Sequence, residues 1–358
     1  RVEIPKDNGK MRLLGIPTVV DRLVQQAINQ ALTPIYENQF SKTSYGFRPR
    51  RGCHDALRGA QKIINEGYKH VVDLDLERFF DTVSHSKLIE ILSRTIKDGR
   101  VVSLIHKYLR SGVMNKGLFE ASEEGTPQGG PLSPLLSNIM LNELDKELER
   151  RGLPFVRYAD DSMIFCKSKR AAMRVKESIT RFIENTLYLK VNKEKTVVSY
   201  VRGVKYLGYS FYVMKGRCEL TVHPKSKAKM KSRLKELTSR SNGWGYAKRK
   251  QKLKEYIRGW VGYYHLANMK RLLLDTDEWL RRRIRMCIWK AWKKVKTKVA
   301  NLIICGINKY QAYEWGNTRK GYWRIADSPI LKRAIDNNKL RSAGYATLIG
   351  SYLEWHPK

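Results

Sequence analysis

The sequence predicts an α+β fold, in which an antiparallel sheet packs on helices and a basic helical region follows. Two observations predict the sheet. Residues 155–166 form two short runs of aromatic and branched residues, joined at two adjacent Asp residues as in a tight hairpin. Residues 71–81 form another strand-like run, on which Asp73 and Asp75 share one face because side chains alternate along a strand. The third observation is the helical spacing of apolar residues among many Lys and Arg after residue 223.

The elements before the first acids follow from local signals. Residues 1–17 predict two strands joined by an Asn-Gly turn. From residue 18 to about residue 40, apolar residues recur at helical spacing, and Thr18 with Asp21 three positions later suits a helix N-terminus. We therefore predict a core helix here. Residues 44–57 contain Gly and Pro and predict a loop.

The elements around the hairpin follow in the same way. Residues 85–120 predict helices and then a short hairpin near residues 115–117. The Gly- and Pro-rich stretch 125–131 predicts a loop that lets backbone approach a ligand closely. Ser133 and Pro134 predict the N-cap and first residue of a helix. A further helix is expected over residues 169–186.

The acids of the predicted sheet are the candidate catalytic centre. Tight hairpins favour Asn-Gly or Asp-Gly, so Asp160 and Asp161 beside apolar strands cost free energy unless a cation compensates. The alternative is an ordinary surface turn, where Asp is also common. If Asp75 converges with them, the three carboxylates suit Mg²⁺, which keeps positions for substrate phosphates. We predict that Asp75, Asp160 and Asp161 hold two Mg²⁺ ions, with Mn²⁺ able to substitute, for an in-line displacement.

Charge points to a polyanionic partner. The 358 residues contain 70 Lys and Arg against 34 Asp and Glu, a formal net charge of +36. Such an excess predicts nucleic acid, with an anionic membrane surface as the weaker alternative. No apolar run reaches the 18 or so residues that span a bilayer, so no membrane partner is expected. The five cysteines include no Cys-x-x-Cys pair, which favours a reduced intracellular setting, and the seven His show no metal-ligand spacing.

Three motifs in order carry a family resemblance. They are Asp-x-x-x-Phe-Phe-Asp at residues 75–81, Gly-Thr-Pro-Gln-Gly-Gly-Pro-Leu-Ser-Pro-Leu at 125–135, and Tyr-Ala-Asp-Asp at 158–161. The chain resembles the reverse transcriptases encoded by bacterial group II introns, of the compact type without an endonuclease domain. The resemblance covers nearly the whole chain and implies a right-hand polymerase fold with fingers, an antiparallel-sheet palm and a three-helix thumb.

The resemblance also implies a domain division. The fingers take residues 1–70 and 84–124, and they are expected to lack an N-terminal extension because the chain begins inside a motif without Met. The palm takes residues 71–83 and 125–222. The thumb, or maturase domain X, takes residues 223–300, where 24 Lys and Arg face five acids. Residues 301–358 form a C-terminal segment expected to contact DNA or RNA.

Five residues are assigned to the incoming nucleotide by the resemblance: Lys6, Arg12, Phe80, Gln128 and Lys195. Lys6 and Arg12 match the basic residues that hold the triphosphate, although they also suit a solvated hairpin. Phe80 matches the aromatic ring that fills the space of a 2′-hydroxyl, and its alternative is a core Phe. Gln128 matches a nucleotide contact. Lys195, in preference to Lys193, matches a Lys near the leaving pyrophosphate.

Nucleic-acid contacts are predicted from aromatic and basic residues that interleave. Tyr45, Phe47, Arg48 and Arg50 combine rings that stack on bases with cations that meet phosphates, and the family places this loop along the template. Gly208 matches a hairpin that grips the primer. In the thumb, the residues expected to contact RNA are Arg258, Arg281, Arg282 and Arg283.

The predicted function is RNA-directed DNA synthesis on a primer with dNTPs, combined with binding of the group II intron RNA to assist splicing and mobility at a DNA target. A cytoplasmic, bacterial setting is implied. Three alternatives remain at this stage. They are a domesticated relative used in DNA repair or phage defence, an RNA-templated RNA polymerase, against which Phe80 argues, and a purely structural splicing factor, against which the three acids argue.

Overall fold

The computed structural model describes all residues except 1, 6–10, 116–117, 121–123, 127–128 and 358. Lys6 and Gln128 therefore lie outside the described residues, as does the side chain of Arg12. The chain divides into two compact units. The first contains residues 1–207 and 211–218, and the second contains residues 208–210 and 219–358.

The first unit is built on a four-stranded antiparallel sheet in the order β6-β7-β3-β8. The hairpin of β6 and β7 pairs Tyr158 with Asp161, and β3 is the central neighbour of β7 and β8. Asp73 of β3 pairs with Met163 of β7. The strands predicted from the two acid-bearing runs are thus adjacent, and the predicted α+β class with an antiparallel palm sheet is confirmed.

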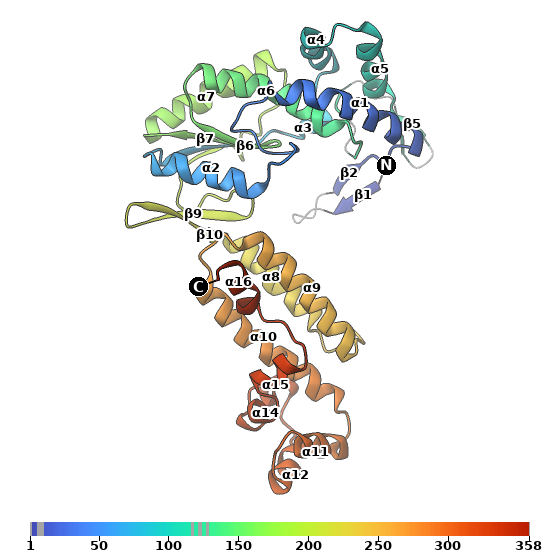
Figure 1. The fold of residues 1–358 in the computed structure, drawn as a ribbon, viewed down its shortest axis with the longest axis vertical. Coiled ribbons are helices and arrows are strands. Elements are labelled where there is room, and N and C mark those ends of the chain that lie inside the picture. Colours follow the sequence, from blue (N-terminus) through green and yellow to red (C-terminus); the bar gives the residue numbers. More distant parts are fainter. Residues whose placement is uncertain (1, 6–10, 116–117, 121–123, 127–128, 358) are drawn as a thin grey trace. The chain divides into compact units, whose positions relative to one another are not determined.

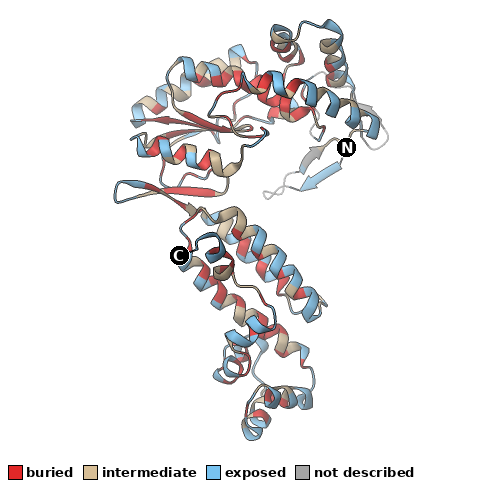
Figure 2. Cartoon of the chain, in the orientation of Figure 1, coloured by how far each residue is buried: buried red, intermediate tan, exposed pale blue. Residues whose placement is uncertain are grey.

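The two faces of the sheet pack differently. Val72, Leu74 and Ile164 point to one face, where they share a buried core with α6 and α7. The opposite face carries Val71 and Phe165, and α2 packs on β6. Figure 1 shows α6 and α7 on one side of the strands and α2 on the other. Figure 2 shows the strands β6 and β7 as buried between these layers.

The elements of the first unit follow the predicted order closely. Its strands, with the β9–β10 hairpin at which the chain passes between the units, are β1 (Val2–Pro5), β2 (Met11–Leu14), β3 (His70–Leu74), β4 (Val113–Asn115), β5 (Leu118–Glu120), β6 (Phe155–Tyr158), β7 (Asp161–Cys166), β8 (Val197–Tyr200), β9 (Tyr209–Met214) and β10 (Arg217–Val222). Its helices are α1 (Val19–Glu37), α2 (Cys53–Asn65), α3 (Phe79–Thr82), α4 (His85–Thr95), α5 (Gly99–Arg110), α6 (Ser133–Arg150) and α7 (Lys169–Thr186).

The helix α1 forms as predicted but is not a core helix along its length. Thr18 caps it, since its hydroxyl accepts from the Asp21 backbone N–H. Only Leu32 and Tyr36 of α1 are buried, whereas Val20 and Leu23 are each 70% exposed. The expectation of a core helix is therefore wrong for the first half of α1, because its apolar stripe extends beyond the elements that cover its second half (Figure 2).

Two predicted boundaries also shift. The strand of the first acids ends at Leu74, so Asp75 follows the strand instead of lying inside it. The chain then turns through Arg78, whose φ of 46° is left-handed, into α3. The helix α6 begins with Ser133 as its first residue and Leu132 as N-cap, one residue earlier than predicted. The shift at α6 is within the one or two residues by which helix ends are ordinarily ambiguous, whereas the strand prediction of 71–81 is wrong after Leu74, because the chain turns there into α3.

The second unit is helical after the β10 strand. The three basic helices expected for the thumb are present as α8, α9 and α10, and α16 packs on both α9 and α10. Its helices are α8 (Pro224–Leu237), α9 (Tyr246–Tyr264), α10 (Lys270–Ala291), α11 (Val295–Ile304), α12 (Lys309–Gly316), α13 (Tyr322–Ile325), α14 (Pro329–Ala334), α15 (Asn337–Ser342) and α16 (Leu348–Trp355). Among the described helices of either unit, none combines the length and apolar character that a membrane crossing requires.

Candidate active site

The predicted catalytic acids meet at one end of the sheet. Asp160 and Asp161 lie at the β6–β7 turn, and the register of β3 on β7, continued by one residue, places Asp75 opposite Asp161. Asp73 points to the same face as Asp75 because it lies two residues earlier. Four carboxylates from two segments far apart in sequence therefore gather at this end of the sheet.

The raised pKa values of two of these acids indicate that the carboxylates are close enough to repel one another. Burial first, and then the carboxylates of Asp73, Asp160 and Asp75, together raise the pKa of Asp161 to about 7, while Lys205 opposes the rise. Burial and the Asp75 charge raise the pKa of Asp73 to about 6. Like charges held together in a partly desolvated site disfavour ionisation. A cation placed among these acids would therefore be strongly favoured.

The donor set suits a hard divalent cation, because carboxylate oxygens are the ligands that Mg²⁺ prefers. The side chains do not form a ready-made cage, however. In the part of the chain that the structure describes, no three acid, His or Cys side chains are arranged to hold one ion. The Asp75 carboxylate instead pairs with Lys195, whose Nζ lies 3.4 Å from both carboxylate oxygens. The residues fit the chemistry of a divalent ion, and Asp75 would have to leave Lys195 to contribute.

The backbone of Asp75 is fixed from the β8 side. Asn192 donates its backbone N–H to the Asp75 carbonyl at 2.9 Å. The Thr196 hydroxyl accepts from the Asp75 N–H at 3.2 Å and donates to the Asp75 carbonyl at 3.3 Å. Thr196 is fully buried. Asp75 thus keeps its position although the regular strand ends one residue before it.

Phe80 lies where the predicted nucleotide loop meets α3. The backbone N–H of Thr126 donates to the Phe80 carbonyl at 2.6 Å, and a Cβ on Gly125 would lie 2.8 Å from that same carbonyl oxygen. Gly125 also has a φ of +88°, so glycine is required here. The Phe80 ring is only half-buried, while its neighbour Phe79 is buried in the core. Of the two rings, Phe80 is therefore the one available to a bound nucleotide.

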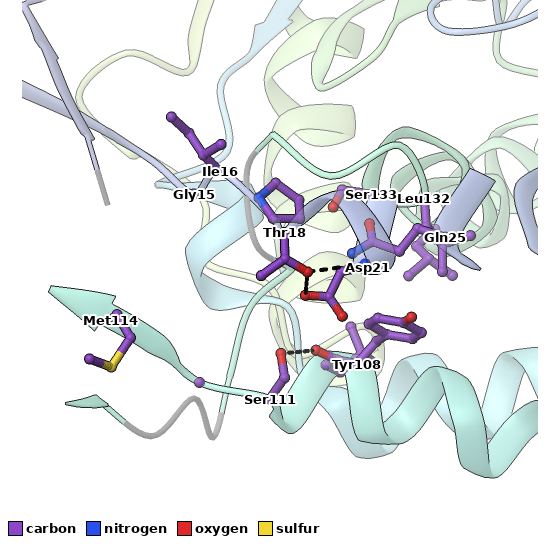
Figure 3. Close-up of a pocket in the computed structure, with 14 residues that line it drawn as sticks. Gly15, Ile16, Thr18, Asp21, Gln25, Tyr108, Ser111, Met114, Leu132 and Ser133 are labelled. Atoms are coloured by element: carbon purple, nitrogen blue, oxygen red, sulfur yellow. Dashed lines mark hydrogen bonds between the residues drawn. The ribbon is translucent and has the colours of Figure 1, made fainter. Parts of the chain in front are cut away.

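A cavity of about 350 Å³ lies elsewhere in the first unit (Figure 3). It lies between the start of α1, the end of α5 and the start of α6, and its lining includes Thr18, Asp21, Tyr108 and Ser133. The acids of the β6–β7 turn do not line it. The Thr18 hydroxyl donates to the Asp21 carboxylate at 2.6 Å, so these two polar groups of the cavity wall pair with each other.

The predicted template loop divides into outward and inward side chains. Phe47 and Arg50 are exposed, each with a left-handed backbone. Tyr45 is half-buried. Arg48 is buried and pairs with Glu37 at 2.7 Å, and it also donates to the Ser41 and Ser44 carbonyls. Because its donors are satisfied inside the protein, Arg48 holds the loop and does not offer its charge to a template.

The predicted RNA-binding arginines of the second unit divide in the same way. Arg258 is exposed on α9. Arg283 donates to the Thr238 hydroxyl and to the Lys235 and Thr238 carbonyls, so it caps the C-terminus of α8. The side chain of Arg282, which is 27% exposed, stacks on Trp323 at 3.9 Å and pairs with Asp327.

Two further predicted contacts in this unit are placed as follows. Arg281 is half-buried, and it lines a cavity with Trp279 and Trp323. Gly208 has a φ of +82°, a left-handed conformation that side chains rarely adopt, and an added Cβ would also lie 2.5 Å from the Tyr264 hydroxyl, so the backbone itself favours glycine here. A close approach of nucleic acid is therefore not needed to explain Gly208.

Sequence reasoning missed several residues of the site. Asp73 is not among the three predicted acids, although its spacing of two residues from Asp75 places it on the same face of the strand. Lys205 acts electrostatically on Asp161 without any local motif to mark it. Arg157 lies in the run of residues 155–166, directly before the Tyr-Ala-Asp-Asp motif, and no local pattern there shows that its side chain is completely buried.

Repulsion and burial of the acids should lower the free energy of unfolding when no metal is bound. A carboxyl whose pKa rises from 3.8 to about 7 on folding favours the folded state at low pH, and this contribution is lost as the pH rises from about 4 through 7. At pH 8 in EDTA we expect Asp161→Asn to melt about 2–4 °C above wild type, the shift that about 1 kcal/mol produces in a domain of this size. The gap should narrow as the pH falls below 7 and close at about pH 4, near the pKa of the unfolded carboxyl.

Thermal melts by circular dichroism at both pH values measure this effect, with Glu66→Gln, an exposed acid at the end of α2, as the control. Equal melting temperatures of Asp161→Asn and wild type at pH 8 would show that the acids do not repel one another. Mg²⁺ should raise the melting temperature of wild type more than that of Asp161→Asn, since the variant has lost one of the charges that attract the ion.

Two sequence families match the chain. The family described as "Reverse transcriptase (RNA-dependent DNA polymerase)" matches residues 4–211, and the family described as "Group II intron, maturase-specific domain" matches residues 227–303. The chain is 37% identical over 248 residues to protein YkfC of Escherichia coli, covering 58% of this chain and 65% of that protein. It is 33% identical over 279 residues to the group II intron-encoded protein LtrA of Lactococcus lactis, covering 60% of this chain and 46% of that protein.

Among solved structures, telomerase from Candida tropicalis in complex with a fragment of telomeric RNA aligns with 99% of this chain and 63% of its own chain. The TM-score is 0.47 and the identity 13%.

The antiparallel palm sheet with acids gathered at the β6–β7 turn defines the palm of a right-hand nucleic-acid polymerase. The family match extends over more than half of the chain. The chain belongs to the reverse transcriptase family, and its second unit carries the maturase-specific domain of the group II intron proteins. The predicted family is thereby confirmed. The chain spans about two thirds and about half of the lengths of the two relatives named above.

Proposed function

We propose that this chain is the RNA-directed DNA polymerase of a group II intron and that it also binds the intron RNA to assist splicing and mobility. The observation that carries the proposal is the convergence of Asp75, Asp160 and Asp161 in the palm of a chain that also has the maturase-specific domain. The test is extension of a DNA primer on an RNA template by the purified chain. Failure of wild type to extend the primer with any divalent metal would refute the proposal.

The acids would hold a pair of Mg²⁺ or Mn²⁺ ions. Bound ions of this kind lower the pKa of the primer 3′-hydroxyl and stabilise the charge that develops on the transferred phosphate. Asp75 directly follows β3 and Asp161 begins the adjacent strand β7, so their side chains would reach the ions from neighbouring positions on one face of the sheet. Lys195 pairs with Asp75 at 3.4 Å. If Asp75 held a metal ion, the Lys195 ammonium would be free of this pair and could donate a proton to the leaving pyrophosphate.

The nucleotide would lie between the acids and α3. Lys6 and Arg12 are assigned to the triphosphate of the nucleotide, and Phe80 is assigned to its sugar. Gln128, from the loop of residues 125–131, is assigned to a further contact with the nucleotide. The part-exposed side chain of Phe80 supports its assignment to the sugar, and the hydrogen bond from the Thr126 N–H to the Phe80 carbonyl holds the backbone that carries this ring at the loop. An aromatic ring at the sugar would exclude an added hydroxyl by steric overlap.

Template, primer and intron RNA would be held by exposed cationic and aromatic residues. From the template loop, Phe47 and Arg50 keep this role because their side chains are exposed. In the second unit, Arg258 and the Arg281–Arg282 region beside Trp323 supply cations and stacking surfaces. Target DNA, and residues 301–358 as its contact, complete the proposal, and a bacterial cytoplasmic location follows from it.

Replacing the Phe80 ring should relax the choice of sugar. In Phe80→Ala, the ratio of kcat/KM for dNTP over NTP should fall at least about tenfold, the scale on which packing against a single small group discriminates. Single-nucleotide extension with matched dNTP and NTP measures the ratio. Phe79→Leu is the control, since Phe79 is buried beside Phe80 and its loss affects packing alone. An unchanged ratio in Phe80→Ala would remove Phe80 from the sugar pocket.

Affinity for structured RNA should depend steeply on salt. If six or so phosphates are contacted, the association constant should fall about 10³-fold between 50 and 200 mM salt, because each neutralised phosphate releases counterions. Filter binding with a group II intron RNA measures the slope. Arg258→Ala should make it shallower, whereas Arg150→Ala, an exposed arginine of α6 paired with Glu147, should leave it unchanged. A flat salt response would contradict a phosphate-binding surface.

A further inference from the structure

A buried arginine lies directly behind the catalytic turn, on the face of the sheet away from the acids. Arg157 is the third residue of β6, and its side chain points toward α6. Its Nε donates to Asp145 Oδ1 at 2.8 Å and its Nη2 donates to Asp145 Oδ2 at 2.5 Å, a bidentate ion pair in which both side chains are fully buried. The desolvation of two buried charges offsets most of their attraction, so an ion pair of this kind adds little net stability. A role in fixing local geometry is the alternative reason for its presence.

The remaining donors of Arg157 bind the turn and its support. Its Nη1 donates to the Ala159 carbonyl at 2.9 Å and to the Asn138 side-chain oxygen at 3.0 Å. Ala159 has a φ of 57°, a left-handed conformation that costs a non-glycine residue strain. The Arg157 side chain therefore hydrogen-bonds the carbonyl of Ala159, a strained residue that immediately precedes Asp160 and Asp161.

The same network reaches the template loop. The Asn138 amide donates to the Gly46 carbonyl at 2.8 Å. The Arg157 backbone N–H donates to the Thr43 carbonyl, and the Arg157 carbonyl accepts from the Tyr45 N–H. A Cβ on Gly46 would lie only 2.2 Å from the Ala159 nitrogen, so the loop is packed against the turn itself. Two segments, α6 and the loop of residues 43–46, thus hold the turn through one guanidinium and one amide.

We propose that Arg157, positioned by Asp145 and Asn138, is a positioning residue that fixes the Ala159–Asp161 turn in the geometry at which Asp160 and Asp161 bind metal. Arg157 contacts neither substrate nor metal and acts through the Ala159 carbonyl. The inference rests on the proposed polymerase function. It adds to that function a support behind the acids, which links their position to α6 and to the template loop.

The central variants separate the effect of the Arg157 charge from that of its hydrogen-bond geometry. Arg157→Met removes all donors and retains most of the volume, whereas Arg157→Lys retains the charge but cannot make the bidentate pair and the two Nη1 bonds together. Asn138→Ala removes the bridge from Arg157 to Gly46 and leaves the ion pair intact. The control is Leu148→Ala, which removes packing at a buried residue near the C-terminal end of α6 and leaves Arg157, Asp145 and Asn138 in place.

Three measurements distinguish positioning from general destabilisation. In primer extension, Arg157→Met should lower kcat about 100-fold and raise the Mg²⁺ concentration for half-maximal rate, while the KM for template–primer stays within twofold; Arg157→Lys should recover part of the kcat. Hydrogen exchange in the peptide of residues 155–166 should quicken in Arg157→Met and Asn138→Ala. Mn²⁺ affinity, measured by electron paramagnetic resonance, should fall in both variants.

Leu148→Ala should lower the melting temperature and leave kcat and exchange at the turn within twofold of wild type. The proposal is overturned if Arg157→Met keeps wild-type kcat and Mg²⁺ dependence, or if its losses match those of Leu148→Ala. Should Arg157→Met not fold, Asn138→Ala decides by the same readouts. If wild type extends no primer, the proposed function fails, whereas exchange and Mn²⁺ binding still decide whether Arg157 positions the turn.

Discussion

Asp160→Ala should abolish primer extension on an RNA template, with a loss of at least about 1,000-fold in kcat, because it removes a ligand that contributes several kcal/mol at about 1.4 kcal/mol per factor of ten. Asp160 lies at the turn between β6 and β7, one of three acids assigned to the metal ions. Single-turnover extension with saturating Mg²⁺ and dNTP measures the chemical step directly. Binding of template and primer should remain, because the basic surfaces are unchanged.

Two controls make this result specific. Glu66→Ala removes an exposed acid at the end of α2 and should retain full activity. Asp160→Ala should also keep its fold, as judged by an unchanged circular dichroism spectrum and a melting temperature no lower than that of wild type. Extension by Asp160→Ala at the wild-type rate would refute the assignment of the metal site.

Gly46→Ala should lower kcat about 100-fold although residue 46 carries no chemistry, because displacing the acids by about 1 Å costs a factor of this order. The added Cβ would lie 2.2 Å from the Ala159 nitrogen and 2.9 Å from the Tyr158 carbonyl carbon, both of which are backbone atoms that cannot rotate away. Either the loop or the catalytic turn must move. Steady-state extension, with kcat and KM determined separately, measures the effect.

Gly99→Ala is the matched control for this substitution. Gly99 begins α5, its backbone is not left-handed, and no atom lies within 4 Å of the Cβ that alanine would add. The control should therefore keep wild-type activity and gain slight stability from the better helix former. A Gly46→Ala variant as active as Gly99→Ala would show that the loop does not constrain the turn.

The palm could be predicted from sequence because its signals are local. Alternation along a strand is enough to place Asp73 and Asp75 on one face, and the apolar runs around Asp160 and Asp161 are enough to predict a hairpin. The spacing of apolar residues likewise predicts α7 over its whole length. These features depend on residues within a few positions of one another, and the structure contains them.

The parts that could not be predicted depend on packing between distant segments. A basic side chain on a loop or helix gives no local sign of whether it will face solvent, and Arg48 and Arg283 turn inward to satisfy carbonyls and, for Arg48, the Glu37 carboxylate. The prediction that α1 is a core helix is wrong in its first half for the same reason, because periodicity reveals an apolar face but not which element covers it. The pairing of Arg157 with Asp145 exists only because α6 packs on β6.

The central claim is that acids from separate strands act together on divalent ions to extend a primer with deoxynucleotides. A templated extension assay on an RNA template, run with Mg²⁺, Mn²⁺ or EDTA and with either dNTPs or NTPs, tests it most directly. We predict extension with Mg²⁺ and dNTPs, weaker extension with NTPs, activity also with Mn²⁺, and none in EDTA. Extension that persists in EDTA, or that prefers NTPs over dNTPs, would contradict the account.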